Sequence, residues 1–239
     1  MSNPPVSELA PTGILRAAIN LSNFLLVSGR SENGDPEGVA PDLAACIADD
    51  LGVDVVYLTF KSPGELADAV TQKVWDIGLI GAEPARAEHI EFTPAYVEIE
   101  ATYLVLGDSP IQAIADVDRP GVRIAVSARS AYDLYLSRHL EHAELVRANG
   151  LDASYDLFVR EGLDALAGLR PRLLSDVQKI DNARLLDGRF TAVQQAVGTP
   201  TGRRASSAYL RDFVAKAKAS GLVAELIERH GIDGLSVAP

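Results

Sequence analysis

The sequence predicts an α/β protein of two similar lobes, and three observations support this. Short apolar segments with the length of buried strands alternate with segments that have helical spacing. The order β-α-β-α-β occurs twice, once within residues 13–80 and again within residues 121–169. No low-complexity linker separates the two runs, so we expect extended strands to join the lobes. Such alternation is typical of open sheets with helices on both faces.

The first run contains three strands and two helices. In its first helix, Leu43, Ile47 and Leu51 recur at four-residue spacing. In its second, Ser62 is placed to be the N-cap and Glu65 completes a capping box. We place the strands at residues 13–19, 53–60 and 75–80, and the helices at 42–51 and 62–73.

The second run repeats this order after a strand at residues 100–106. Ser130 caps its first helix, with Asp133 at the third helical position. We place the strands at residues 121–126, 145–147 and 163–169, the second helix at 155–161, a last strand at 192–197, and C-terminal helices at 205–219 and 222–230.

Composition excludes several classes of partner. The formal charge of −11 disfavours nucleic acid and anionic membranes, because both would repel the chain. No segment reaches the roughly eighteen apolar residues of a membrane span. A single cysteine, Cys46, excludes an internal disulfide. His139 and His142 lie three residues apart, which fits a solvated helix face better than a metal site, so we expect no cofactor and no metal.

The N-terminal segment, residues 1–12, has neither a basic start nor an apolar core of the kind an export signal needs. Two alternatives follow. Either an export signal has been removed and the protein is periplasmic, or the chain is complete and the protein is cytoplasmic.

Several motifs carry a resemblance to a known family. Residues 75–81 (WDIGLIG), Arg86 and residues 90–96 (IEFTPAY) closely resemble the signature of family 3 extracellular solute-binding proteins. These proteins deliver polar amino acids and related solutes to ABC importers. The similarity continues through nearly the whole chain, at residues 38–43, 121–130 and 162–165 and in the C-terminal helical pair.

The resemblance implies the periplasmic binding protein type II fold, in which two α/β lobes are joined by two crossing hinge strands and the ligand lies in the cleft between them. One lobe would comprise residues 1–99 and 195–239, and the other residues 100–194. It also implies a monomer that closes on its ligand by hinge motion, with an ABC permease as partner.

Arg86 and Ser130 are the first ligand-binding candidates. Arg86, which follows Gly81, matches the family arginine that binds the ligand carboxylate, and a guanidinium offers two parallel donors to such a group. Ser130 and Ala131 match the family turn where a helix N-terminus meets an anionic group. The alternatives are a surface ion pair of Arg86 and an ordinary N-cap at Ser130.

The departures from the family pattern concern the ammonium of an amino-acid ligand. The family aspartate that binds this group would fall at Leu169, which is followed by Arg170. An apolar residue cannot balance a cation, and an arginine would repel one. We therefore expect a small organic anion, carboxylate-bearing and not an ordinary α-amino acid, with Arg170 as a further contact. A structural salt bridge from Arg170 to Asp164 or Asp176 is the alternative.

The other candidates are weaker. Glu83 stands where the family often has threonine, and it could neutralise Arg86 or accept an ammonium. Arg129 stands where the family often has glycine and could add a positive group. We also name Asn20 and Phe24, in the loop that commonly supplies family contacts, although a Phe-Leu-Leu run can equally be core, and Tyr132 near the helix start.

Three functional classes remain open. A solute receptor for ABC-transporter uptake is the leading one, and a cytoplasmic small-molecule sensor would use the same fold. A dehydratase-like enzyme is the alternative from another class, but Glu83 alone, without a nucleophile and base, is insufficient for catalysis. We therefore expect no catalytic residues. The effector half of a LysR-type regulator is disfavoured by the acidic charge.

Overall fold

The computed structural model describes residues 4–239, which form two units that each contain an α/β sheet. Unit 1 comprises Met1–Glu98 and Gln194–Pro239, and unit 2 comprises Ile99–Val193. The boundary between the units falls within two ten-residue strands, β7 (Val97–Leu106) and β12 (Thr191–Pro200).

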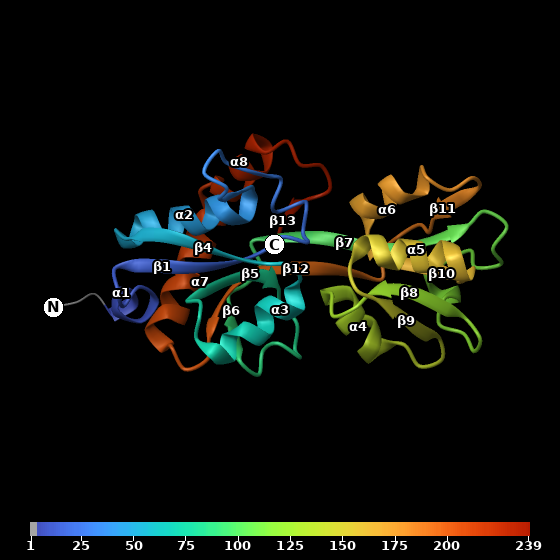
Figure 1. Ribbon diagram of the computed structural model, residues 1–239, viewed down its shortest axis with the longest axis horizontal. Coiled ribbons are helices and arrows are strands. Elements are labelled where there is room, and N and C mark those ends of the chain that lie inside the picture. Colours follow the sequence, from blue (N-terminus) through green and yellow to red (C-terminus); the bar gives the residue numbers. More distant parts are fainter. Residues whose placement is uncertain (1–3) are drawn as a thin grey trace. The chain divides into compact units, whose positions relative to one another are not determined.

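Unit 1 has the strand order β4-β1-β5-β12. β1 (Ile14–Asn20) is parallel to β4 (Asp54–Phe60) and to β5 (Ile77–Gly81), and β12 is antiparallel to β5. Helix α2 (Val39–Leu51) connects β1 to β4, and α3 (Pro63–Asp68) follows β4. The two helices cover opposite sides of the sheet (Figure 1), so they define two separate cores. The remaining elements are α1 (Pro4–Leu9), β2 (Gly29–Arg30), β3 (Pro36–Glu37), η1 (Ala69–Gln72), β6 (Ile90–Phe92), α7 (Arg204–Ala219), α8 (Leu222–Arg229) and β13 (Ser236–Val237).

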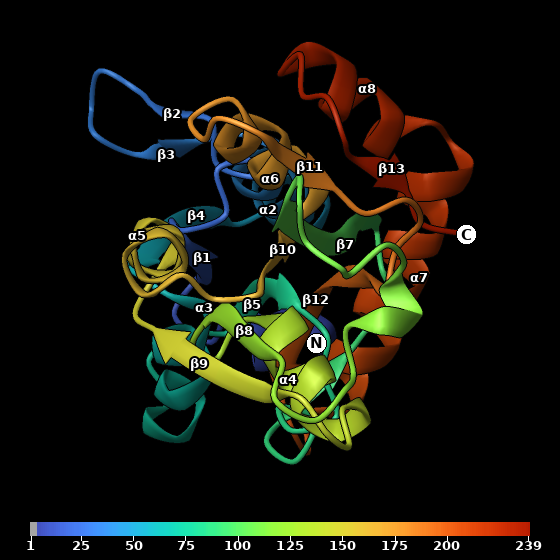
Figure 2. The ribbon, with the colours of Figure 1, turned by 90° about the vertical axis from the view of Figure 1, so that its right-hand side faces the viewer.

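Unit 2 repeats this topology with the order β7-β10-β8-β9. β8 (Arg123–Ser127) is parallel to β9 (Glu144–Ala148) and to β10 (Ala165–Leu169), and β7 is antiparallel to β10. Helices α4 (Ala131–His139) and α5 (Leu151–Glu161) lie on opposite sides of β8 and β9 (Figure 2). The strands β8, β9, β10 and β7 therefore correspond to β1, β4, β5 and β12. The remaining elements are η2 (Ile114–Asp116), α6 (Arg170–Val177) and β11 (Ala183–Leu185).

A buried ion cluster holds three elements of unit 1 together. The Asp76 carboxylate is fully buried and accepts from Arg16 on β1 (Nε to Oδ2 2.8 Å, Nη2 to Oδ1 2.9 Å) and from Arg203 before α7 (Nη1 to Oδ1 3.0 Å). The hydrogen bond to Asp76 raises the pKa of the Arg16 guanidinium. The Thr199 hydroxyl on β12 donates to the Asp76 carbonyl (3.1 Å). The residue before β5 thus anchors β1, β12 and α7.

The helix starts are confirmed where the sequence offered a capping side chain. Ser62 and Ser130 are the N-caps of α3 and α4, and each accepts from the backbone N–H three residues later. The residue 62–73 helix is divided into α3 and the 3-10 helix η1. None of the described helices is long and apolar enough to cross a membrane.

Other helix boundaries were predicted wrongly. α5 begins at Leu151, four residues before the predicted start, because Gly150 adopts φ 104° and begins the helix without a capping side chain. α6 was not predicted, although Pro171 in its first turn is a typical helix-start signal. α1 was also not predicted, and residues 1–3 of the polar N-terminal segment lie outside the described residues.

We predict that Asp76→Asn destabilises the protein by about 3 kcal/mol, because two guanidinium groups lose their shared carboxylate. The value is at the low end for a broken buried ion pair, since both guanidinium groups are partly exposed to water. Urea unfolding followed by circular dichroism measures the difference.

Asp212→Asn is the matched control, because Asp212 is an exposed carboxylate on α7. It should change stability by less than about 0.5 kcal/mol. Equal stabilities of the two variants would contradict the anchoring role of Asp76.

Candidate functional site

The topology of each unit indicates a candidate binding position at the carboxyl ends of its strands. β1 has a parallel neighbour on each side, β4 and β5, so the chain changes direction across the sheet at β1. The same holds for β8, which lies between β9 and β10. Ligands of open α/β sheets bind outside the carboxyl ends of the strands at such a reversal. In unit 1 these ends are Asn20 and Gly81, and in unit 2 they are Ser127 and Leu169. We describe these candidate positions separately, as the unit 1 half-site and the unit 2 half-site.

The candidate Arg86 lies at the unit 1 half-site. It lies in a turn directly after β5, where its backbone N–H donates to the Glu83 carbonyl (2.9 Å). Its side chain is 6% exposed, and Nη1 donates to the Gly81 carbonyl at the end of β5 (2.6 Å). A permanently charged guanidinium is therefore held, mostly out of water, at the carboxyl end of the strand. Because of this turn, Glu83 and Arg86 lie close together at the same end of β5.

The loop after β1 supplies the other unit 1 candidates. The Asn20 side-chain carbonyl accepts from the Ser22 backbone N–H (3.2 Å) and from its hydroxyl (2.8 Å), which shapes the start of this loop. Phe24 is 40% exposed, whereas Leu25 and Leu26 are buried. The Phe-Leu-Leu run is therefore core at its two leucines only, and the Phe24 ring remains accessible.

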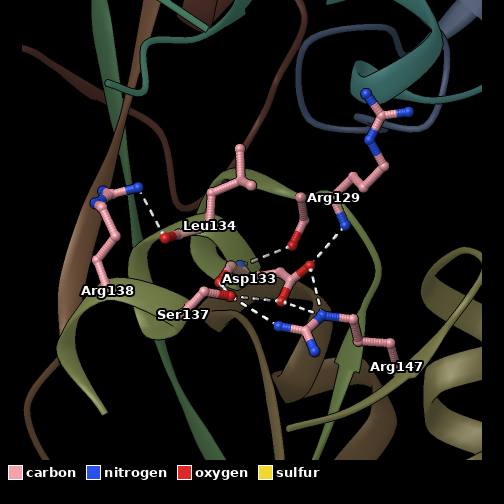
Figure 3. Close-up of polar contacts among 7 residues, drawn as sticks. Arg129, Asp133, Leu134, Ser137, Arg138 and Arg147 are labelled. Carbon is pink, nitrogen blue, oxygen red and sulfur yellow. Dashed lines mark hydrogen bonds and ion pairs between the residues drawn. The ribbon is translucent and has the colours of Figure 1, made fainter. Parts of the chain in front are cut away.

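In unit 2, the N-terminus of α4 is held by two side chains (Figure 3). The Ser130 hydroxyl accepts from the Asp133 N–H (3.1 Å), and the Asp133 carboxylate accepts from the Arg129 N–H (2.7 Å). In a capping box, the side chain at the third helical position accepts from the N-cap N–H. Here the Asp133 carboxylate accepts instead from the N–H of Arg129, the residue before the N-cap.

Two backbone donors at this helix start remain open. Ala131 and Tyr132 occupy the first two helical positions, whose N–H groups have no acceptor within the helix. Among the described residues, no acceptor is found for either N–H elsewhere. Since these donors lie at the positive end of the helix dipole, the position suits an anion.

Asp133 places a negative charge close to that position, but an arginine compensates it. The Asp133 side chain is 3% exposed, and Arg147 Nε donates to both of its oxygens (2.9 and 3.3 Å). Arg147 Nη2 also donates to the Ser137 hydroxyl (2.8 Å), so the pair is fixed on both sides, as Figure 3 shows. The carboxylate therefore does not cancel the attraction of the helix start for an anion.

Arg129 has an unusual backbone. Its φ is 60°, in the left-handed region that favours glycine, and its side chain extends away from the Asp133 cluster (Figure 3). Tyr132, by contrast, is 3% exposed, and burial raises the pKa of its hydroxyl to about 12. Its ring belongs to the interior, so only the backbone of Tyr132 is available at this half-site.

Arg170 makes a structural ion pair, although with a different partner from those predicted. Its Nε donates to Glu100 Oε2 (2.7 Å) and its Nη2 to the Gly188 carbonyl (2.5 Å). The predicted partners are engaged elsewhere: Asp164 accepts from the Arg123 N–H, and Asp176 from Arg172. Sequence reasoning missed Glu100, which lies 70 positions from Arg170 and is brought near by the antiparallel pairing of β7 and β10.

Leu169 ends β10 and is 7% exposed. Its neighbour Arg170 begins α6, with its guanidinium held beside Glu100. The carboxyl end of β10 therefore presents an apolar side chain and a paired cation.

Sequence reasoning also missed Arg147, the partner of Asp133. β8 and β9 are parallel, with Val126 opposite Arg147, and this pairing brings the guanidinium toward the helix that follows β8. Only the strand pairing could have revealed it, because nothing in the local sequence links the two residues.

Solved structures with the same fold are numerous. An ancestral amino acid-binding protein, described as a precursor of cyclohexadienyl dehydratase, has a TM-score of 0.75 and 19% identity, with 94% of this chain and 97% of that chain covered. A mutant of ArgBP from T. maritima gives 0.74 and 21%, covering 95% and 99%. A lysine-complexed binding component of an ABC transporter from Wolinella succinogenes gives 0.74 and 19%, covering 91% and 95%. At these identities the similarity shows the fold.

Comparison with curated protein sequences gives no match. The family model of the bacterial extracellular solute-binding proteins, family 3, matches residues 22–232, which is most of the chain. The fold of the solved neighbours is that of the type II periplasmic binding proteins. This chain therefore belongs to family 3 of the bacterial extracellular solute-binding proteins.

Proposed function

We propose that this protein is a receptor for a small organic anion that carries a carboxylate and lacks a free ammonium, and that it serves ABC-transporter uptake. The observation that carries the proposal is the carboxyl end of β10. There, Leu169 and the paired Arg170 stand in place of an acceptor for an amine. Membership of a solute-binding family supports binding rather than catalysis.

Both half-sites have the chemistry for anionic groups. Arg86 offers a guanidinium that a carboxylate can engage through two hydrogen bonds. The start of α4 offers the N–H groups of Ala131 and Tyr132. On this proposal, unit 1 binds an anionic group through a side-chain cation, and unit 2 binds one through backbone donors.

An ammonium on the ligand would meet no compensation at β10. Burying a cation against Leu169 costs several kcal/mol unless a carboxylate accepts its protons. Glu100 is such a carboxylate in unit 2, but it already accepts from Arg170 at 2.7 Å. Several neighbours of this fold are named for amino acids, including the lysine complex, and in their case the ligand contains both charges. We infer that this chain retains recognition of the carboxylate and has lost that of the ammonium.

Glu83 is the carboxylate that could bind a ligand ammonium, since it lies beside Arg86 at the end of β5. The same residue is the only support for the dehydratase alternative. Both alternatives predict that Glu83→Gln abolishes function, whereas the receptor proposed here retains binding in that variant.

Matched ligands test the proposal. Glutarate and glutamate share a carbon skeleton and differ by the ammonium group, so their affinities isolate its effect. We expect glutarate, or another dicarboxylate in a panel of such pairs, to bind at least tenfold more tightly than its amino-acid counterpart by isothermal titration calorimetry. Tighter binding of the amino acid across the panel would contradict the proposal.

We predict that Arg86→Met weakens binding of the best carboxylate about 100-fold, which corresponds to about 2.7 kcal/mol. The loss reflects two charge-assisted hydrogen bonds. Arg86→Lys should recover part of the affinity, because it restores the charge but not the paired donors.

Arg204→Met is the control, since Arg204 is an exposed arginine at the start of α7. Unfolding curves of all three variants separate lost binding from lost folding. Unchanged affinity in a folded Arg86→Met protein would remove Arg86 from the site.

We also predict that Ala131→Pro weakens binding about tenfold without lowering stability. Proline is well tolerated at the first helical position, and the substitution deletes the N–H that we assign to the ligand. Ser130 already has φ −65° and ψ 160°, a conformation that a following proline permits.

Ala131→Gly retains the N–H and is the matched control for calorimetry. If both variants bind equally well, the start of α4 does not supply a backbone donor to the ligand.

A further inference from the structure

A second candidate binding position lies at the opposite end of the unit 1 sheet. A groove of about 490 Å³ is lined by residues from the start of β1, from the middle of β4 and from the turn before β5. This volume is within the usual range for small-molecule sites. The lining residues are Thr12, Ile14, Arg16, Val56, Leu58, Lys73 and Val74.

The groove exists because α3 covers only part of this sheet face. Ile14 and Ala18 share the face, since side chains alternate along a strand, but Ala18 is fully buried in the α3 core while Ile14 is 37% exposed. On β4, Leu58 packs against the same core and Val56 is 44% exposed. The apolar face is therefore open toward the start of the strands.

The groove lining carries more positive than negative charge, unlike the chain as a whole, whose formal charge is −11. Asp54, which pairs with Ile14 at the start of β4, lies outside the lining. The lining includes two cations and, among the described residues, no carboxylate. Arg16 and Arg203 share the single carboxylate of Asp76, which leaves one positive charge in excess. The Arg16 side chain is 35% exposed, and its Nη1 has no hydrogen-bond acceptor among the described residues.

Lys73 adds the second charge. Its φ is 54° because it is the left-handed C-cap of η1, where its backbone N–H donates to the Val70 carbonyl (3.1 Å). No carboxylate pairs with its ammonium in the described part of the chain.

We propose that this groove binds a free amphipathic carboxylate, with its apolar chain on Ile14, Val56 and Leu58 and its carboxylate beside Lys73 and Arg16. The groove thus offers an apolar surface to the chain of the ligand and two cations to its carboxylate. The position is separate from the half-site at the end of the same strand. Ile14 and Asn20 are the two ends of β1, about 20 Å apart at roughly 3.3 Å per residue.

Decanoate, below its critical micelle concentration, is the probe, and decan-1-ol is its uncharged counterpart. We expect calorimetry to show decanoate binding that weakens about tenfold in Lys73→Asn, with decanol affinity unchanged. Asparagine removes the charge while tolerating the left-handed backbone. Lys61→Asn removes an exposed lysine of the same unit and is the control.

Val56→Glu provides an independent test, because Val56 is exposed enough to be replaced without loss of folding. A carboxylate there should abolish decanoate binding by repulsion. The proposal is overturned if decanoate does not bind, or if neither Lys73→Asn nor Val56→Glu weakens decanoate binding. It is also overturned if Arg86→Met alone weakens decanoate binding, because decanoate would then occupy the unit 1 half-site. It is also overturned if Val56→Glu changes the sedimentation coefficient while decanoate fails to bind, because the face would then be a contact between copies.

Discussion

The Asp76 carboxylate is the interaction on which the arrangement of unit 1 most depends. It is fully buried at the start of β5, and the two guanidinium groups that compensate it come from β1 and from the residue before α7. Because a buried charge without a partner is expensive, these elements cannot move apart independently. β5 leads from this anchor directly to Gly81, to whose carbonyl Arg86 donates. The stability of the sheet and the position of the first ligand candidate are therefore linked through one short strand.

On the proposed function, the two units would use the same topology for anion recognition in different ways. In unit 1, a mostly buried side-chain cation stands beyond β5, whereas in unit 2 the first turn of α4 offers backbone donors beyond β8. A guanidinium gives directed, paired hydrogen bonds, and a helix start gives donors that cannot be lost by titration. The Asp133–Arg147 pair fixes the second arrangement and balances the carboxylate that the helix start requires for capping.

Sequence reasoning predicted most elements because their signals are local. Ser62 and Ser130 are capping side chains. The apolar residues of β1 after Ile14 and all residues of β5 are buried. It failed where the determinant was backbone geometry, as at Gly150, whose positive φ begins α5.

For the candidate site, the residues with a local motif could be named from the sequence, but their partners could not. Glu100 reaches Arg170, and Arg147 reaches Asp133, only through the pairing of strands that are far apart in the chain. Long-range register decides these contacts, and no local spacing encodes it.

The central claim is that the ligand is an organic anion without an ammonium group. The most direct measurement is to denature the purified protein, recover whatever small molecule copurifies, and determine its accurate mass and its reactivity toward an amine-specific reagent. The account predicts an acid that contains a carboxylate and does not react. Recovery of a stoichiometric α-amino acid would contradict it.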